Sequence, residues 1–141
     1  MSKPVVIESD KLTFFDIDDT LVKWSFSQVE AEKFGIHFDN FGYKTLLVPH
    51  RTHIEQLKKH KSRGHKIAVW SAGGWDWANE VIKTLQLEDY VDVIMSKPSW
   101  YYDDLTSSQF MPEANRVYKP DEIWEKKDIK PAEPFENPFD E

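Results

Sequence analysis

The residues best suited to chemistry in this sequence are Asp16 and Asp18, which follow the short apolar run of residues 13–15. Such runs are typical of buried strands in parallel sheets, and ligands of open α/β sheets bind at the carboxyl ends of those strands. Two carboxylates held together there repel each other, so that one protonates or the pair recruits a cation. The pair therefore suits a nucleophile, a neighbouring acid/base and a divalent metal ion. Asp19 or Thr20 alone would also fit an acidic turn or a helix N-cap.

A second candidate strand, residues 66–70, ends in Ser71, Ala72 and Gly73. A hydroxyl and the backbone N–H groups of small residues at a strand end can bind a phosphoryl oxygen. Ser and Gly after a strand also form ordinary turns, so this segment gains weight only from its neighbours.

Two further segments place charged groups in the same kind of position. The candidate strand of residues 90–95 is followed by Lys97, and the aromatic, strand-like run of residues 100–102 leads into Asp103 and Asp104. A single lysine in a loop or an acidic pair is also typical of a solvated surface. The order of all four segments along the chain, each at a strand end, is what makes the set specific.

Taken together, the four segments resemble the four motifs of the haloacid dehalogenase-like (HAD) hydrolases, over residues 12 to about 105. The motifs are Asp16 with Asp18, then Ser71, then Lys97, then Asp103 with Asp104. The resemblance implies a small, capless or minimally capped phosphatase that forms an aspartyl-phosphate on Asp16, uses Mg2+, and then hydrolyses the intermediate.

The same resemblance implies a role for each residue. The catalytic set is Asp16 as nucleophile, Asp18 as general acid/base, and Ser71 and Lys97 as neutralising groups for the phosphoryl oxygens. An acid at the position of Asp18 favours phosphate esters, because the dehalogenases and ion-pumping ATPases of the family lack it. The substrate-binding set adds Thr20, Ala72 and Gly73, and the Mg2+ ligands would be Asp16, the backbone carbonyl of Asp18, and Asp103 or Asp104.

The sequence departs from the family in one place. Lys97 and Asp103 are too close for a full helix between them, as in compact members in which the last two motifs merge. This compression leaves open which carboxylate of the doublet binds the metal.

The alternation of strand-like and helix-like segments predicts an α/β fold, a Rossmann-like three-layer sandwich with a central, mainly parallel sheet. We expect one domain over residues 1–127, a flap insertion at about 24–49, and an acidic, Pro-rich tail at 128–141. The other elements predicted are helices at 25–34, 50–63, 75–86 and 120–127, a hairpin of 36–38 with 43–48, and an edge strand at 115–118.

Composition restricts the class of protein further. The 141 residues suffice for one core, the absence of cysteine excludes thiolate chemistry, and no stretch has the character of a membrane span or signal peptide. We therefore expect a cytoplasmic protein. A net charge of −7 argues against general nucleic-acid binding. The basic, histidine-rich residues 50–66 are interpreted mainly as the solvated face of a helix, with attraction of an anionic substrate as the alternative.

Two other functions use a similar set of residues. A phospho-acceptor signalling domain also combines carboxylates, a hydroxyl and a lysine around Mg2+, although its acceptor aspartate follows a later strand. A catalytically idle HAD-like module would bind a partner through exposed aromatic residues. For an enzyme, the substrate is a small phosphorylated molecule such as a nucleotide or a sugar phosphate, or a phosphorylated nucleic-acid end.

Overall fold

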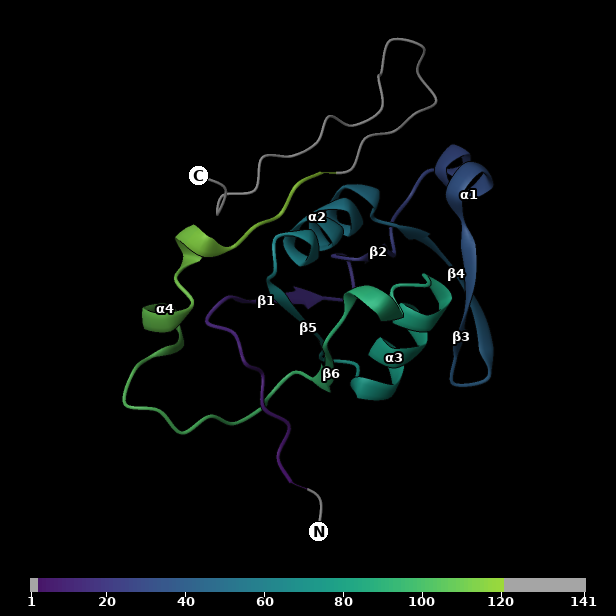
Figure 1. The fold of residues 1–141 in the computed structure, drawn as a ribbon. Helices are drawn as coiled ribbons and strands as arrows, with labels where there is room; N and C mark the ends of the chain where they lie inside the picture. The colour runs from purple at the N-terminus through teal and green to yellow at the C-terminus, as the bar shows by residue number, and fades with distance from the viewer. Residues whose placement is uncertain (1–2, 121–141) are drawn as a thin grey trace.

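Three parallel strands form the sheet that carries the predicted catalytic residues. The computed structural model describes residues 3–120. Within them β1 (Leu12–Asp16), β5 (Lys66–Ser71) and β6 (Val93–Ser96) pair in the order β1-β5-β6 (Figure 1). Parallel strands have their carboxyl ends at one edge of the sheet, so residues that follow β1, β5 and β6 are brought together there. The α/β class predicted from the sequence is confirmed.

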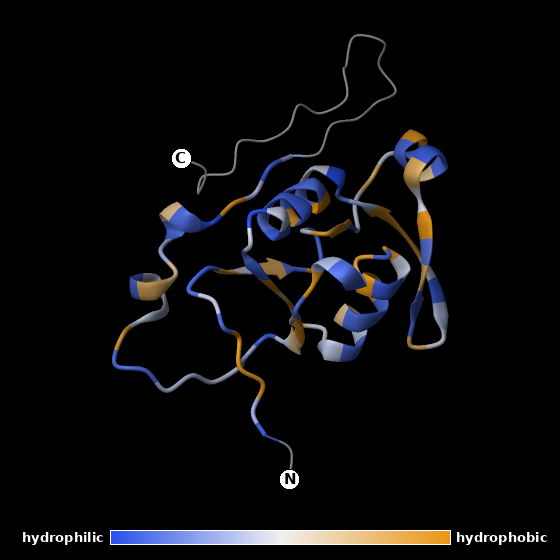
Figure 2. Ribbon diagram, in the orientation of Figure 1, coloured by the Kyte–Doolittle hydropathy of each residue, from blue (hydrophilic) through white to orange (hydrophobic). Residues whose placement is uncertain are grey.

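Helices α2 (Arg51–Ser62) and α3 (Trp75–Thr84) flank this sheet and share one apolar core with it. Alternate strand residues point into that core, as the period of a β-strand requires, and the strands are correspondingly hydrophobic in Figure 2. On the opposite face Leu12 and Phe14 are 41% and 37% exposed. The buried residues that join the sheet to the helices are Phe15, Ile67, Val69, Leu57, Val81 and Ile82.

The insertion after β1 forms a second, antiparallel sheet with one helix. It contains β2 (Val22–Lys23), α1 (Gln28–Phe34), β3 (Ile36–Asn40) and β4 (Tyr43–Pro49), and the strand order is β2-β4-β3. The predicted hairpin is therefore confirmed. Helix α1 starts three residues later than predicted, because Ser27 and Glu30 form a capping box at its N-terminus.

The base of the hairpin belongs to the core, whereas its tip is solvent-exposed. Phe38 and Leu47 are buried, and the Phe38 ring meets the Trp77 ring of α3 edge-on at 6.3 Å. Phe41 at the turn is 66% exposed. The insertion thus continues the main core at one end and projects from it at the other.

The C-terminal part of the described chain contains only short elements. They are the 3-10 turns η1 (Glu88–Tyr90) and η2 (Glu113–Asn115) and the four-residue helix α4 (Ser107–Phe110). The edge strand predicted at residues 115–118 is wrong, since Asn115 ends η2 and residues 116–120 form no strand. The backbone N–H of Lys119 donates to the side chain of His53 at 2.8 Å rather than to a neighbouring strand. The tail at 128–141 and nearly all of the helix predicted at 120–127 lie outside the described residues.

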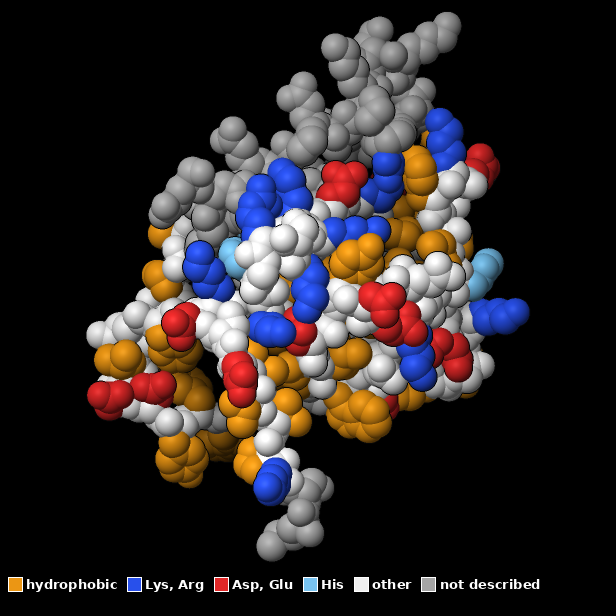
Figure 3. Space-filling view, in the orientation of Figure 1, with side chains coloured by type: hydrophobic (Ala, Val, Ile, Leu, Met, Phe, Trp, Pro, Cys, Tyr) orange, Lys and Arg blue, Asp and Glu red, His pale blue; other side chains and the backbone are white. Residues whose placement is uncertain are grey.

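The interpretation of residues 50–66 as a solvated face is wrong for the histidines. His50, His53, His60 and His65 are all buried. The His50 and His53 rings stack at 3.8 Å, and the Nδ1 atoms of His60 and His65 lie 2.8 Å apart. The lysines and arginines of this stretch do gather on the surface over α2 (Figure 3).

Candidate active site

Asp16 ends β1 and is contacted by two of the predicted site residues. Its Oδ1 lies 3.4 Å from the Nζ of Lys97, and its Oδ2 accepts a hydrogen bond of 3.4 Å from the hydroxyl of Thr20. The backbone N–H of Lys97 donates to the carbonyl of Ser71 at 2.9 Å, which keeps Lys97 at the end of β5. A half-buried carboxylate is thus held beside an ammonium group at the carboxyl edge of the sheet.

The turn after β1 presents Asp18 toward the same edge. The carbonyl of Ile17 accepts backbone N–H groups from Thr20, Leu21 and Val22, and Ile17 and Leu21 are fully buried. Asp19 has a φ of 60°, in the left-handed region that Asp tolerates better than most residues. Two buried apolar anchors and one tight turn therefore fix the backbone around Asp18.

Asp18 accepts three side-chain hydrogen bonds. The indole N–H groups of Trp24 and Trp77 both donate to its Oδ1, at 2.9 and 3.0 Å, and the hydroxyl of Ser71 donates to its Oδ2 at 3.3 Å. Trp24 follows β2, and Trp77 lies in the first turn of α3. Sequence reasoning did not identify these two tryptophans as partners of Asp18. The available signal was that each lies within a few residues of a predicted motif and carries a single N–H donor.

Ser71 and the start of α3 form the second part of the site. Ser71 is fully buried, and its Oγ accepts the backbone N–H of Gly73 at 2.9 Å. A Cβ at Gly73 would lie 3.3 Å from both Ser71 Oγ and the Trp77 ring, so this position requires glycine or a shift of its neighbours. Gly74, with a φ of 107°, is the N-cap residue that precedes α3. The ten-residue helix directs the positive end of its dipole toward this corner, which favours a bound anion.

The structure does not bring Asp103 and Asp104 to these residues. Both side chains are exposed, and Asp103 Oδ1 accepts the backbone N–H of Leu105 at 2.9 Å. Residues 100–102, which the sequence suggested as a strand, do not form a strand. Figure 1 shows the chain leaving β6 in an extended loop that runs away from the sheet before α4. In residues 3–120 no cluster of three or more His, Cys, Asp or Glu side chains is arranged around a metal position. The role of the doublet as a metal ligand stays a prediction.

His53 links the catalytic turn to the C-terminal segment, and sequence reasoning did not identify it. Its Nδ1 lies 2.8 Å from the carbonyl of Thr20, and its Nε2 accepts the backbone N–H of Lys119 at 2.8 Å. Because a carbonyl only accepts, the proton is on Nδ1 and the ring is neutral. A buried imidazole thus supports the backbone next to Asp18 and Asp16.

A comparison with protein-family models identifies the family to which the chain belongs. The family model described as NIF, NLI interacting factor-like phosphatase, matches residues 11–112. The chain belongs to this family. The NIF family is part of the HAD-like phosphatases, so the chain is a HAD-like phosphatase, and the matched range contains every site residue predicted from the sequence.

The other comparisons add no relative to the NIF match. No curated protein and no solved structure matches the chain. Among residues 3–120, none of the helices has the length and apolar character needed to cross a lipid bilayer.

Proposed function

We propose that this NIF-family phosphatase is a Mg2+-dependent phosphomonoester hydrolase that acts through an aspartyl-phosphate on Asp16, with Asp18 as the general acid/base. The observation that carries the proposal is the placement of Asp16 between Lys97 and Thr20, with Asp18 beside Ser71. A carboxylate next to a cation and a hydroxyl next to an acid are the groups that a two-step phosphoryl transfer needs.

In the first step a carboxylate oxygen of Asp16 attacks the phosphorus and the bond to the ester oxygen breaks. Asp18 gives its proton to that leaving oxygen. In the second step Asp18 takes a proton from water, the water oxygen attacks the phosphorus, and the bond to Asp16 breaks to release phosphate. Asp18 is thereby returned to its protonated form for the next cycle.

The phosphoryl group would be bound by the Lys97 ammonium group, the Ser71 hydroxyl and the backbone of residues 72–73, which precede α3. The Ser71 hydroxyl, now bonded to Asp18, would turn to a phosphoryl oxygen. Ala72 and Gly73 lie just before α3, and the backbone N–H of Ala72 would add a donor, joined by that of Gly73 when it leaves the Ser71 hydroxyl. Thr20 would hold Asp16 in the orientation for attack.

For Mg2+, the donor chemistry of Asp16 and Asp18 fits, because carboxylate and carbonyl oxygens are hard ligands. Asp16 and the backbone carbonyl of Asp18 would hold the ion, and when bound it neutralises negative charge on the phosphoryl oxygens. A third ligand from Asp103 or Asp104 requires the loop of residues 98–106 to approach the end of β1.

We propose that the substrate is a small phosphorylated molecule, such as a nucleotide or a sugar phosphate. The insertion at 24–49 would act as a flap over the site, within one domain that would extend to about residue 127. The substrate's leaving group would lie beside Asp18, the group that gives it a proton. The deciding test measures phosphate release from a panel of phosphomonoesters, with and without Mg2+, for the wild type and Asp16→Asn.

The expected result is Mg2+-dependent turnover by the wild type and none by Asp16→Asn, because a neutral amide is a poor nucleophile. Asp39→Asn is the control, since Asp39 is exposed in the hairpin and an amide oxygen still accepts the N–H of Gly42. Phosphorylation of Asp16 without turnover would instead identify a phospho-acceptor domain. The absence of both phosphorylation and turnover would identify an idle binding module.

A further inference from the structure

The two carboxylate oxygens of Asp18 accept hydrogen bonds from different donors. Oδ1 accepts both indole N–H groups, at 2.9 Å from Trp24 and 3.0 Å from Trp77, whereas Oδ2 accepts the weaker bond of the Ser71 hydroxyl at 3.3 Å. A carboxylate oxygen has about two lone-pair directions, so two well-placed donors occupy Oδ1. A proton on Oδ1 would take one of these two directions and displace at least one of the N–H donors.

We propose that Trp24 and Trp77 are positioning residues that restrict the catalytic proton of Asp18 to Oδ2, the oxygen beside Ser71 and the phosphoryl site. The inference rests on the proposed acid/base role of Asp18 and adds which atom carries the proton and which residues determine it. Neither tryptophan touches the reacting atoms through this bond; each acts through Asp18.

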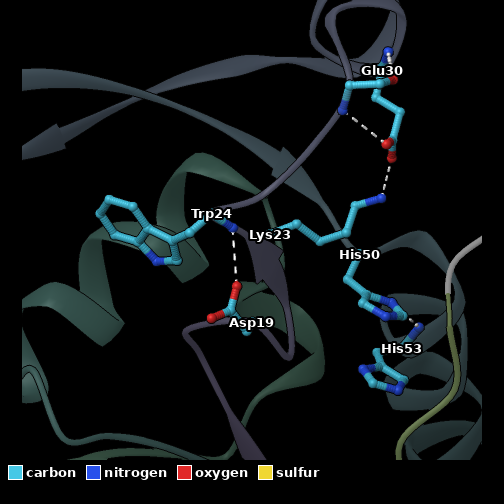
Figure 4. A network of polar contacts seen from close by, with 7 residues as sticks. Asp19, Lys23, Trp24, Glu30, His50 and His53 are labelled. Atoms are coloured by element: carbon cyan, nitrogen blue, oxygen red, sulfur yellow. Dashed lines mark hydrogen bonds and ion pairs between the residues drawn. The ribbon is translucent and has the colours of Figure 1, made fainter.

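The two donors come from different parts of the fold, and each is fixed independently. Trp24 is held at two points. Its backbone N–H donates to Asp19 Oδ1 at 3.1 Å (Figure 4), and its indole N–H donates to Asp18 Oδ1. Trp77 is only 5% exposed and packs against Phe38. The two rings lie 6.3 Å apart and tilted by 46°, so their N–H groups converge on one oxygen from separate directions.

This arrangement also orients the carboxyl group as a whole. An aspartate side chain can rotate about its last torsion, which is broad and roughly two-fold, and exchange its two oxygens. For the protonated acid, two indole donors on one side and a hydroxyl on the other make the two orientations unequal, since only one keeps the proton away from the indole N–H groups and beside Ser71. The acid is thus already aligned before the substrate binds, which is how a positioned group gains efficiency.

The test uses two substrates that differ in their need for a proton. An alkyl phosphate expels an alkoxide and requires general acid help, whereas 4-nitrophenyl phosphate expels a stable anion and requires little. Removing one donor weakens only the protonation step, and general acid catalysis contributes on the order of 10²–10⁴-fold. Trp24→Phe should therefore lower kcat/KM about tenfold for the alkyl phosphate and less than about threefold for the nitrophenyl ester.

Trp75→Phe is the matched control. Trp75 lies on the same helix two residues from Trp77, is more than half exposed, and its indole makes no hydrogen bond to Asp18. It should leave both values unchanged within about twofold, as expected of an exposed substitution that removes no positioning donor. Trp77→Phe should show the same split as Trp24→Phe, but it also loosens the core, so the exposed Trp24 carries the test. Equal losses on both substrates in Trp24→Phe would overturn the proposal.

A second measurement does not depend on activity. The indole N–H resonances of Trp24 and Trp77, assigned from the two Trp→Phe variants, should both move upfield in Asp18→Ala because their carboxylate acceptor is gone. Unmoved resonances would overturn the positioning role even if the enzyme is active. Absence of any phosphomonoester turnover by the wild type would instead refute the proposed function, and with it the proton on Oδ2.

Discussion

The ammonium group of Lys97 lies 3.4 Å from Oδ1 of Asp16, although the two residues are 81 positions apart in the sequence. Both side chains are partly exposed, so solvent screens the pair and its contribution to folding stability is small. The pairing is of more use to catalysis than to the fold. It places a positive charge where an incoming phosphoryl group would bring negative charge to an already negative nucleophile.

Replacing Lys97 with Met should therefore impair catalysis and spare the fold. Removing a preorganised charge at a reacting phosphoryl group costs on the order of 10²–10³-fold in kcat. The thermal unfolding midpoint should stay near that of the wild type, because the lost ion pair is exposed. Steady-state kinetics on the best substrate of the panel, with unfolding curves for both proteins, provides the check.

Lys44→Met is the control for that variant, since Lys44 is an exposed lysine in β4, near the hairpin tip. It should behave as wild type. If Lys97→Met retains wild-type kcat and KM, the assignment of Lys97 to the phosphoryl site is wrong.

The second prediction concerns the metal site and the acidic doublet. If Asp103 or Asp104 completes the set of Asp16 and Asp18, millimolar Mg2+ should raise the melting temperature, by an amount set by its concentration relative to Kd. Asp103→Asn and Asp104→Asn should each be compared by differential scanning fluorimetry with and without the ion. The variant that removes the direct ligand should lose the larger part of the shift.

Asp39→Asn should keep the whole shift, because Asp39 is an exposed residue near the end of β3 and its side chain accepts the Gly42 N–H. An unmoved wild-type curve at millimolar Mg2+ would argue against a shared metal site. Full shifts in both doublet variants would place the third ligand elsewhere.

The sequence predicted the parts of this site that depend on strand periodicity. Asp16, Ser71 and Lys97 follow apolar runs, and runs that form parallel strands must deliver their next residues to one edge. Asp103 and Asp104 follow a run that forms no strand, and nothing in local periodicity determines the path of such a loop. The Trp77 bond to Asp18 spans 59 residues and depends on how α3 packs, which periodicity does not specify. The same holds for His53, whose link to Lys119 replaces the strand predicted at 115–118.

The third prediction separates the base of the insertion from its tip. Phe38→Ala should lower the free energy of unfolding by about 3–5 kcal/mol, because Phe38 is buried in the core against Trp77. Phe41→Ala removes an aromatic ring of the same size from the exposed turn and should change stability by no more than about 0.5 kcal/mol. Urea unfolding of both variants measures the difference. Equal costs would mean that the hairpin packs as a single unit from base to tip.

The last prediction concerns Asp92, which joins β5, β6 and α2. Its Oδ1 accepts from Lys61 Nζ at 2.8 Å with Lys66 Nζ at 3.7 Å, and its Oδ2 accepts the backbone N–H of Ile67 at 2.8 Å. Partial burial raises the pKa of Asp92, but the bonds from Lys61 and Ile67 and the charges of Lys61 and Lys66 outweigh it and lower the pKa below 3.8. A carboxyl whose pKa is lower in the folded than in the unfolded state binds protons more weakly when folded.

The stabilisation from Asp92 is therefore present above its unfolded pKa, near 3.8, and is lost as the pH falls through its lower folded pKa. Asp92→Asn keeps an acceptor for Ile67 but loses the charge, so it should cost roughly 1 kcal/mol at neutral pH. Chemical unfolding of both proteins from neutral pH to about pH 2 should show the difference shrinking toward zero in the acidic range. A difference that stays constant across the range would mean that the variant disturbs packing around Ile67, and that the charge of Asp92 adds nothing to stability.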